Sequence, residues 1–182
     1  DAEDRFGFEE VAWLLIFGPL PTRSQYEGFS RLLFENRELP EYFPEDMIIK
    51  APSKNIMNKL ARSVLALYSY DDSPDDLSLE NNMRQSISLI ARMPSIMSYA
   101  YQVKRRHFDR ESMFFHPYEP DHATAEAILN ALRPDRKFTH QEAKLLDLLM
   151  VLHAEHGGGN NSTFTTRVLT SAGTDMYSPI GA

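Results

Sequence analysis

Apolar residues recur at helical spacing along most of the chain, and no stretch alternates apolar and polar residues as a half-buried strand would. The pattern therefore predicts an all-α fold without an internal repeat. The predicted helices cover residues 8–17, 22 to before Pro40, 53–70, 77–108, 123–132, 139 to the glycines at 157, and 163–172.

Pro94 lies inside the longest of these patterns. Because proline has no N–H to donate and its ring crowds the preceding turn, we expect a kinked or split helix. The far end of this helix is basic, at 104–107. That charge complements a helix C-terminus, and a phosphate contact is the alternative.

Residues 144–167 contain the most informative pattern in the chain. Leu145–Leu152 is apolar apart from Asp147, which predicts a helix buried on most sides. Continued helical spacing then brings His153 and His156 out of the core close together.

Three glycines and three cap-forming residues follow the histidines. Glycine at 157–159 is expected to end the helix, because glycine tolerates positive φ. Asn160, Asn161 and Ser162 are preferred N-cap residues for the helix predicted at 163–172. A buried histidine pair beside a helix N-terminus suits an anion. On this interpretation the site is an anion site.

Each part of this site also has a structural interpretation. A histidine at the end of an apolar helix is more often a core or capping residue than a ligand, and three glycines are usually a loop. A metal bound by His153, Glu155 and His156 is an alternative. The two histidines form an HxxH pair, and no further ligand is visible at a suitable spacing from them, so we expect no metal site.

Composition narrows the class of protein. The chain has 182 residues, of which 42% are hydrophobic and 25% charged, enough for one domain with a core. Its net charge of −7 argues against nucleic acid as a partner, and the absence of cysteine excludes thiolate sites. With no signal-like start and no long apolar run, we expect a soluble, cytoplasmic protein without a membrane partner.

The acidic stretch 71–76 is expected to be a solvated loop, since its spacing does not fit a calcium loop.

The segment from His153 to Ser162 resembles the H-[AS]-[DE]-H-x-G-G-N-x-S stretch of citrate synthases. Phe8 to Pro21 is similar to an early FEEVA-x-LL-x-G-x-LP segment of the same family. Residues 134–139 and 173–182 are also family-like, so the resemblance covers nearly the whole chain.

The resemblance implies an acyltransferase that condenses acetyl-CoA with oxaloacetate. It implies that His156 and Asn160 bind oxaloacetate, and that Ser162 is a catalytic-site residue that orients the catalytic histidine. It also implies a homodimer that needs no cofactor besides acetyl-CoA as co-substrate. 2-Methylcitrate synthase and a non-catalytic helical interaction module of the same ancestry are the alternatives.

The family pattern continues into a GP-x-HGG stretch with the catalytic histidine and then a small domain with the catalytic aspartate. The 182 residues contain neither of these. We therefore expect residues 1–182 to be part of the large helical domain, truncated before the small domain and inactive in isolation.

Overall fold

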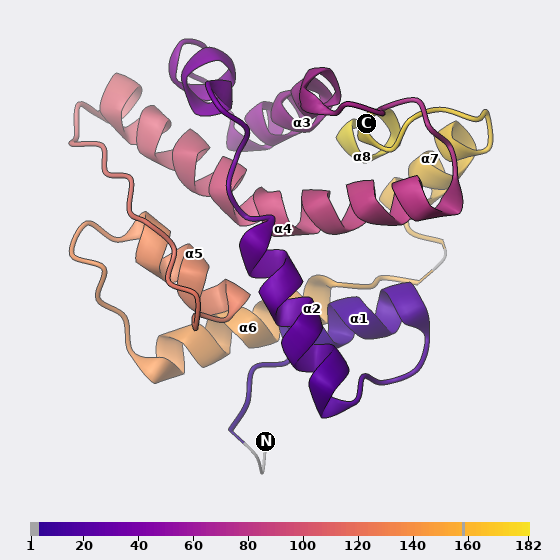
Figure 1. Cartoon of the computed structure of the whole chain (residues 1–182). Helices are drawn as coiled ribbons and strands as arrows, with labels where there is room; N and C mark the ends of the chain where they lie inside the picture. Colours follow the sequence, from indigo (N-terminus) through magenta and orange to yellow (C-terminus); the bar gives the residue numbers. More distant parts are fainter. Residues whose placement is uncertain (1–3, 158) are drawn as a thin grey trace. The chain divides into compact units, whose positions relative to one another are not determined.

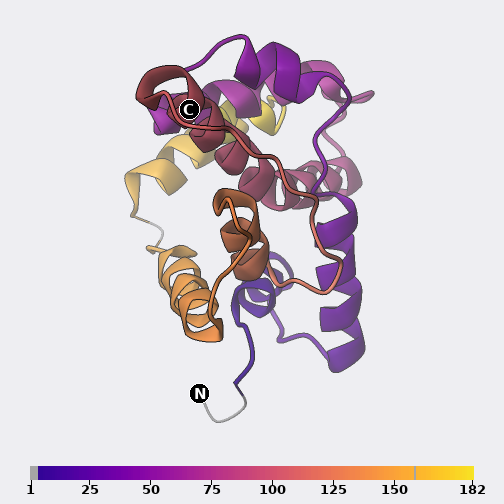
Figure 2. The ribbon, with the colours of Figure 1, turned by 90° about the vertical axis from the view of Figure 1, so that its left-hand side faces the viewer.

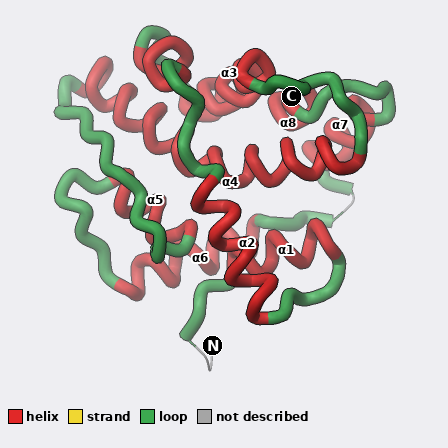
Figure 3. Tube along the Cα trace, viewed as in Figure 1, coloured by secondary structure: helices red, strands yellow, loops and turns green. Residues whose placement is uncertain are grey.

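The computed structural model describes residues 4–157 and 159–182, which form helices joined by loops (Figure 3). No strand occurs in these two ranges, which confirms the predicted all-α class. The chain divides into two compact units. The first unit combines residues 4–35 with Phe114–His156, and the second combines Asn36–Met113 with Gly157–Ala182. The assignment of all residues to one large domain stays a prediction.

The first unit contains four helices. They are α1 (Phe8–Phe17), α2 (Arg23–Glu35), α5 (Thr124–Leu132) and α6 (His140–His153). Helix α1 has the predicted bounds: Gly18 ends it at φ +90°, and Pro19 cannot continue a helix. Helices α5 and α6 lie side by side, and α1 contacts both (Figures 1 and 2).

Buried carboxylates hold the starts of two helices in this unit. Asp147 of α6 is 5% exposed and accepts hydrogen bonds from the backbone N–H groups of Gly7 (2.8 Å) and Phe8 (3.0 Å). Glu9 of α1 is 3% exposed and accepts a hydrogen bond from the N–H of Thr124 (2.7 Å) at the start of α5. Each carboxylate satisfies N–H groups that have no partner within their own helix and lies at the positive end of the helix dipole.

An aromatic cluster joins α1 to α2. The Trp13 ring lies 4.1 Å from that of Phe17 and 5.6 Å from that of Phe29, measured between centroids. Phe29 and Leu33 of α2 are almost fully buried. These side chains recur at helical spacing, so the apolar stripe read from the sequence forms the contact between the two helices.

The second unit contains the other four helices and three short helical turns. The helices are α3 (Ile56–Leu67), α4 (Leu79–Lys104), α7 (Asn161–Thr170) and α8 (Tyr177–Gly181). Two turns are π-helical, at Pro44–Ile49 and Arg105–Asp109, and one is a 3₁₀ turn at Tyr68–Tyr70. The sequence did not predict Pro44–Ile49 or α8, because segments of five or six residues are too short to show a helical period.

Helix α4 continues through Pro94 instead of splitting there. Its axis changes direction partway along its length (Figure 1). The Pro94 carbonyl accepts a hydrogen bond from the Ser98 hydroxyl at 2.8 Å. A bend lets a helix accommodate the missing N–H while both halves stay packed. Of the two expected outcomes, the split is therefore wrong.

The core of the second unit gathers side chains from α3, α4, α8 and the turn at Pro44–Ile49. Its buried members are Phe43, Ile48, Val64, Leu67, Leu89, Ile96, Ala100, Val103 and Tyr177. Helix α8 closely approaches α3, since a Cβ added to Gly181 would lie 2.8 Å from a side-chain carbon of Leu65. A larger residue at this position would push the two helices apart.

Asp71 connects α4 to α8, and its side chain is only 4% exposed. It accepts hydrogen bonds from the Tyr177 hydroxyl (2.6 Å), the Gln85 amide (3.0 Å) and the Arg84 guanidinium (2.6 Å). Burial alone would raise the pKa of Asp71, but the hydrogen bonds, that of Tyr177 first, outweigh it and lower the pKa to about 2. The expectation of a solvated acidic loop is therefore wrong at its first residue.

We expect Asp147→Ala to lower the free energy of unfolding by about 2–3 kcal/mol, because it leaves two N–H groups at the start of α1 without their charged acceptor. Urea unfolding measures the change. The control is Asp121→Asn, which removes a charge at an exposed turn of the same unit. Equal effects of the two substitutions would contradict a capping role for Asp147.

We also expect Asp71→Asn to make stability less dependent on acid. The folded pKa of Asp71 lies below its value in the unfolded chain, so its contribution is fully present above about pH 5 and is lost as pH falls toward 2. The shift corresponds to roughly 2 kcal/mol. Unfolding curves of both proteins at pH 7 and pH 2.5 should show a penalty for the variant that shrinks in acid. A penalty that is the same at both pH values would contradict this prediction.

Candidate functional site

Helix α6 is not buried on most sides, contrary to the sequence prediction. Four of its five leucines are 44–62% exposed, at positions 145, 148, 149 and 152, and Leu146 is partly buried. Only Ala143 and Asp147 of this helix are buried. The reason is that, within the first unit, α6 packs on one side only, against α1 and α5.

His153 and His156 lie next to each other at the end of α6, as predicted. Their ring centroids are 6.0 Å apart and the rings are inclined by 68°. Both side chains are exposed, so the expectation of a buried pair is wrong. The helix ends at His153, one turn earlier than predicted, so His156 lies beyond it and not on a continued helical stripe.

The ring of His153 is fixed by the end of its own helix. Its Nδ1 lies 2.7 Å from the carbonyl oxygen of Leu149. A carbonyl can only accept, so Nδ1 is the donor and Nε2 keeps its lone pair in the neutral ring. Glu155, the third residue of the metal alternative, is exposed. No group of three potential metal ligands occurs in the described parts of the chain.

The glycine segment turns the chain between α6 and α7. Gly157 has φ +83°, which is the backbone conformation that favours glycine, and its carbonyl accepts a hydrogen bond from the N–H of Asn160 (3.1 Å). Gly158, also part of the predicted turn, lies outside the described residues.

Asn160 is the N-cap of α7, which confirms the predicted new helix within two residues of its expected bounds. Its Oδ1 accepts hydrogen bonds from the N–H groups of Ser162 (2.9 Å) and Thr163 (3.3 Å). The cap fixes the orientation of the amide and leaves its Nδ2 donors available. Ser162 lies in the first turn of α7 with an exposed side chain.

The structure thus brings the predicted residues together in two pairs. His153 and His156 lie in the first unit, and Asn160 and Ser162 lie in the second. The gathering of His156, Asn160 and Ser162 around one ligand stays a prediction.

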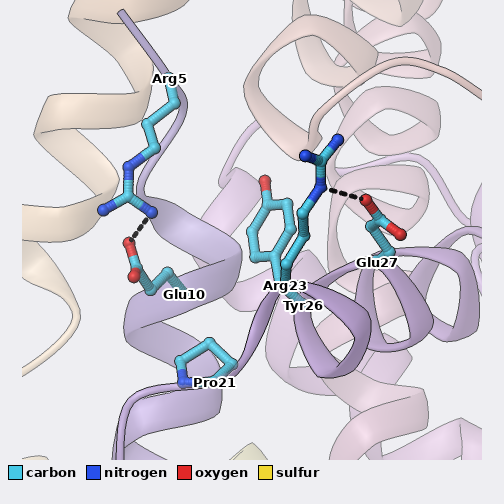
Figure 4. A pocket seen from close by; sticks show the side chains of 6 residues that line it. All are labelled: Arg5, Glu10, Pro21, Arg23, Tyr26 and Glu27. Atoms are coloured by element: carbon cyan, nitrogen blue, oxygen red, sulfur yellow. Dashed lines mark hydrogen bonds and ion pairs between the residues drawn. The ribbon is translucent and has the colours of Figure 1, made fainter. Parts of the chain in front are cut away.

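Two hollows elsewhere are each lined by two arginines. In the first unit, a hollow of about 620 Å³ is bordered by Tyr26 and two ion pairs. Arg5 pairs with Glu10 and Arg23 pairs with Glu27, both at 2.9 Å (Figure 4). Each of these guanidinium groups already faces a carboxylate, so we assign no ligand to this hollow.

The other hollow lies in the second unit and has a volume of about 420 Å³. It is lined by Tyr70, Asp71, Asp72, Ser73, Arg84, Arg92 and Tyr177. Sequence reasoning missed this group because Tyr177 is 106 residues away from Asp71 along the chain. The acidic stretch was a local signal, but its arginine partners lie on another element.

The fold and the segment between α6 and α7 define a class, an all-α protein with a histidine pair at the end of one helix and a side-chain cap at the start of the next. None of the helices in the described ranges is long and apolar enough to span a membrane.

Comparison with known proteins then gives the family. The family described as "Citrate synthase, C-terminal domain" matches residues 1–182, and the chain therefore belongs to the citrate synthase family. It is 31% identical to a citrate synthase of Haloferax volcanii over 95% of its length, and 27% identical to a 2-methylcitrate synthase of Shewanella oneidensis over 98%.

Solved structures agree with this assignment. The chain is similar to citrate synthase from Pyrobaculum aerophilum, with a TM-score of 0.83 and 26% identity over 96% of the chain. It shares the fold of Thermoplasma acidophilum citrate synthase, crystallised with carboxymethyl coenzyme A and oxaloacetate, with a TM-score of 0.84 at 22% identity over 99% of the chain. The chain spans 44–45% of the length of these four relatives.

Substitution of Asn160 tests the role of its side-chain oxygen as the cap of α7. Asn160→Asp keeps the acceptor for α7, so we expect unfolding stability close to that of the native protein, while Asn160→Ala should lose about 1 kcal/mol. Thermal unfolding followed by circular dichroism measures both. If both variants lost the same stability, the side-chain oxygen would not be the cap of α7.

Proposed function

We propose that this chain is the part of a citrate synthase that contributes His156, Asn160 and Ser162 to the oxaloacetate site. The enzyme condenses acetyl-CoA with oxaloacetate to give citrate and free coenzyme A. The observation that supports this most directly is the histidine pair followed by the capped start of α7, in a chain that belongs to the citrate synthase family.

The reaction makes two demands on such a site. A weakly acidic methyl proton of the thioester has to be removed, and a dianionic keto acid has to be held with its carbonyl group polarised. His156 donates an imidazole N–H to oxaloacetate, and the Asn160 amide donates from Nδ2. Donors fixed in advance stabilise the oxygen on which negative charge develops as the new carbon–carbon bond forms.

Ser162 has a positioning role in this proposal. Its hydroxyl hydrogen-bonds the catalytic histidine, which the resemblance locates in a GP-x-HGG stretch that does not occur in these 182 residues. The isolated chain is therefore inactive in this proposal, because it lacks the general acid–base groups. The enzyme uses no metal or cofactor besides acetyl-CoA as co-substrate, and it functions in the cytoplasm.

Two alternatives remain within the family. The likeness to a 2-methylcitrate synthase supports a larger acyl group on the thioester, with the same roles for His156 and Asn160. A non-catalytic helical module would keep the fold and lose the oxaloacetate contacts. Oxaloacetate binding distinguishes the module from both enzymes, and the relative turnover of acetyl-CoA and propionyl-CoA distinguishes the enzymes from each other.

We also propose that the protein pairs as a homodimer through large-domain helices. The second unit exposes large apolar side chains of α3, α7 and α8, which are Leu65, Phe164, Val168 and Ile180, at 44–63% exposure. An apolar surface of this kind suits a helix–helix interface. Helix α4, which the family resemblance also implies for this interface, buries Leu89, Ile96 and Val103 inside the unit and exposes Leu79 and Tyr101.

In the full-length protein we expect His156→Gln to lower kcat/KM for oxaloacetate about 10- to 100-fold, because a charge-assisted hydrogen bond contributes roughly 1.5–3 kcal/mol. Unfolding stability should hardly change, since the side chain is exposed. Steady-state kinetics and thermal unfolding measure the two effects.

The matched control is His153→Gln, one helical turn away. It loses the hydrogen bond to the Leu149 carbonyl, so we expect about 1 kcal/mol lower stability and a smaller kinetic effect. The reverse result, with His153 controlling the kinetics, would move the oxaloacetate contact to His153. No kinetic effect from either substitution would count against the proposed site.

A further inference from the structure

Arg92 is a half-buried cation to which the described residues supply no carboxylate partner. Its Nε donates a hydrogen bond of 3.3 Å to the backbone carbonyl of Glu38. In the parts of the chain that the structure describes, no carboxylate forms an ion pair with it. Burial lowers the pKa of Arg92, as expected for a guanidinium that has lost water without gaining a full counter-charge. Such a group is stabilised when an anion reaches it.

The neighbouring charges do not supply this anion. Asp71 is engaged by hydrogen bonds from Tyr177, Gln85 and Arg84, and Arg84 already balances its charge. Arg84 contacts Asp71 through Nη2 and the Asn81 side-chain oxygen through Nε and Nη2, so its Nη1 has no partner among the described residues. The second arginine therefore offers a further donor to the hollow.

Two hydroxyl groups complete the lining. The Tyr70 ring packs edge-on against the buried Phe43 at 5.2 Å, which holds the tyrosine in place, and Ser73 lies three residues further along the chain. Donors from two guanidinium and two hydroxyl groups match an anion that carries several oxygens, such as phosphate. Asp72 is exposed on the same lining and opposes an anion.

The volume of about 420 Å³ is within the range of small-molecule sites and exceeds what one phosphate ion fills. The arginine hollow of the first unit differs in charge, because both of its guanidinium groups are paired with glutamates. Arg92 is thus the feature that distinguishes this hollow.

We propose that the hollow formed by Tyr70, Ser73, Arg84 and Arg92 binds a phosphate group, either free or carried by a small organic molecule. This site lies wholly within the second unit, and its lining does not include His156, which belongs to the first unit. The inference does not depend on the proposed citrate synthase activity, and its test needs no turnover.

Isothermal titration of the 182-residue protein with inorganic phosphate, AMP and adenosine tests this proposal. We expect saturable binding of phosphate or AMP and none of adenosine. Tighter binding of AMP than of phosphate identifies an organic carrier, and equal or weaker binding identifies the free ion; either supports the site. Binding of adenosine as tight as that of AMP, or binding of none of the three, overturns the proposal.

Substitutions identify the residues involved. Arg92→Gln should weaken binding at least about tenfold, and Asp72→Asn should strengthen it. The control is Arg106→Gln, which removes the same charge at an exposed position fourteen residues further along, about 21 Å at the rise of a helix, and should change nothing. Equal losses in the Arg92 and Arg106 variants would indicate general surface charge and overturn the proposal. If Arg92→Gln fails to fold, Arg92→Lys keeps the charge but lacks the planar guanidinium and should still weaken binding; unchanged binding in that variant overturns the proposal.

Discussion

The first unit depends on carboxylates buried at helix starts. Asp147 of α6 accepts hydrogen bonds from the beginning of α1, and Glu9 of α1 accepts one from the beginning of α5. Two side chains therefore connect three helices. Each carboxylate meets backbone N–H groups that a helix cannot satisfy itself. Because each carboxylate has to reach a helix start, it also determines the position of the contact along the helix axis. The apolar faces fix which sides of the helices meet, whereas the carboxylates fix where along each helix the contact falls.

The sequence predicted the parts of the fold that depend on local spacing. Gly18 and Pro19 gave the end of α1, and helical periodicity gave all the long helices. It could not predict α8, a helix of five residues held by the Asp71–Tyr177 hydrogen bond across 106 positions. It predicted a kinked or split helix at Pro94, and α4 bends but stays continuous, since both of its halves are packed.

In the candidate site, too, the features that depend on neighbouring residues were predictable and those that depend on distant residues were not. The histidine pair and the Asn160 cap follow from neighbouring residues, and both were predictable. Exposure of the histidines was not, because it depends on what covers α6. The partial burial of Arg92 could not be predicted, since an arginine on a helix is usually solvated. It results from the backbone at Glu38, which lies against Arg92.

The leucines of α6 combine the sequence pattern of a buried helix with an exposed position in the structure. Leu145 and Leu152 are among the most exposed large apolar residues of the first unit, although the pattern around them is that of a buried helix. A row of leucines facing water is typical of a surface that packs against further polypeptide. Within the first unit the apolar run of α6 is thus largely a surface, while Asp147, the one polar residue within that run, makes the contact with the start of α1.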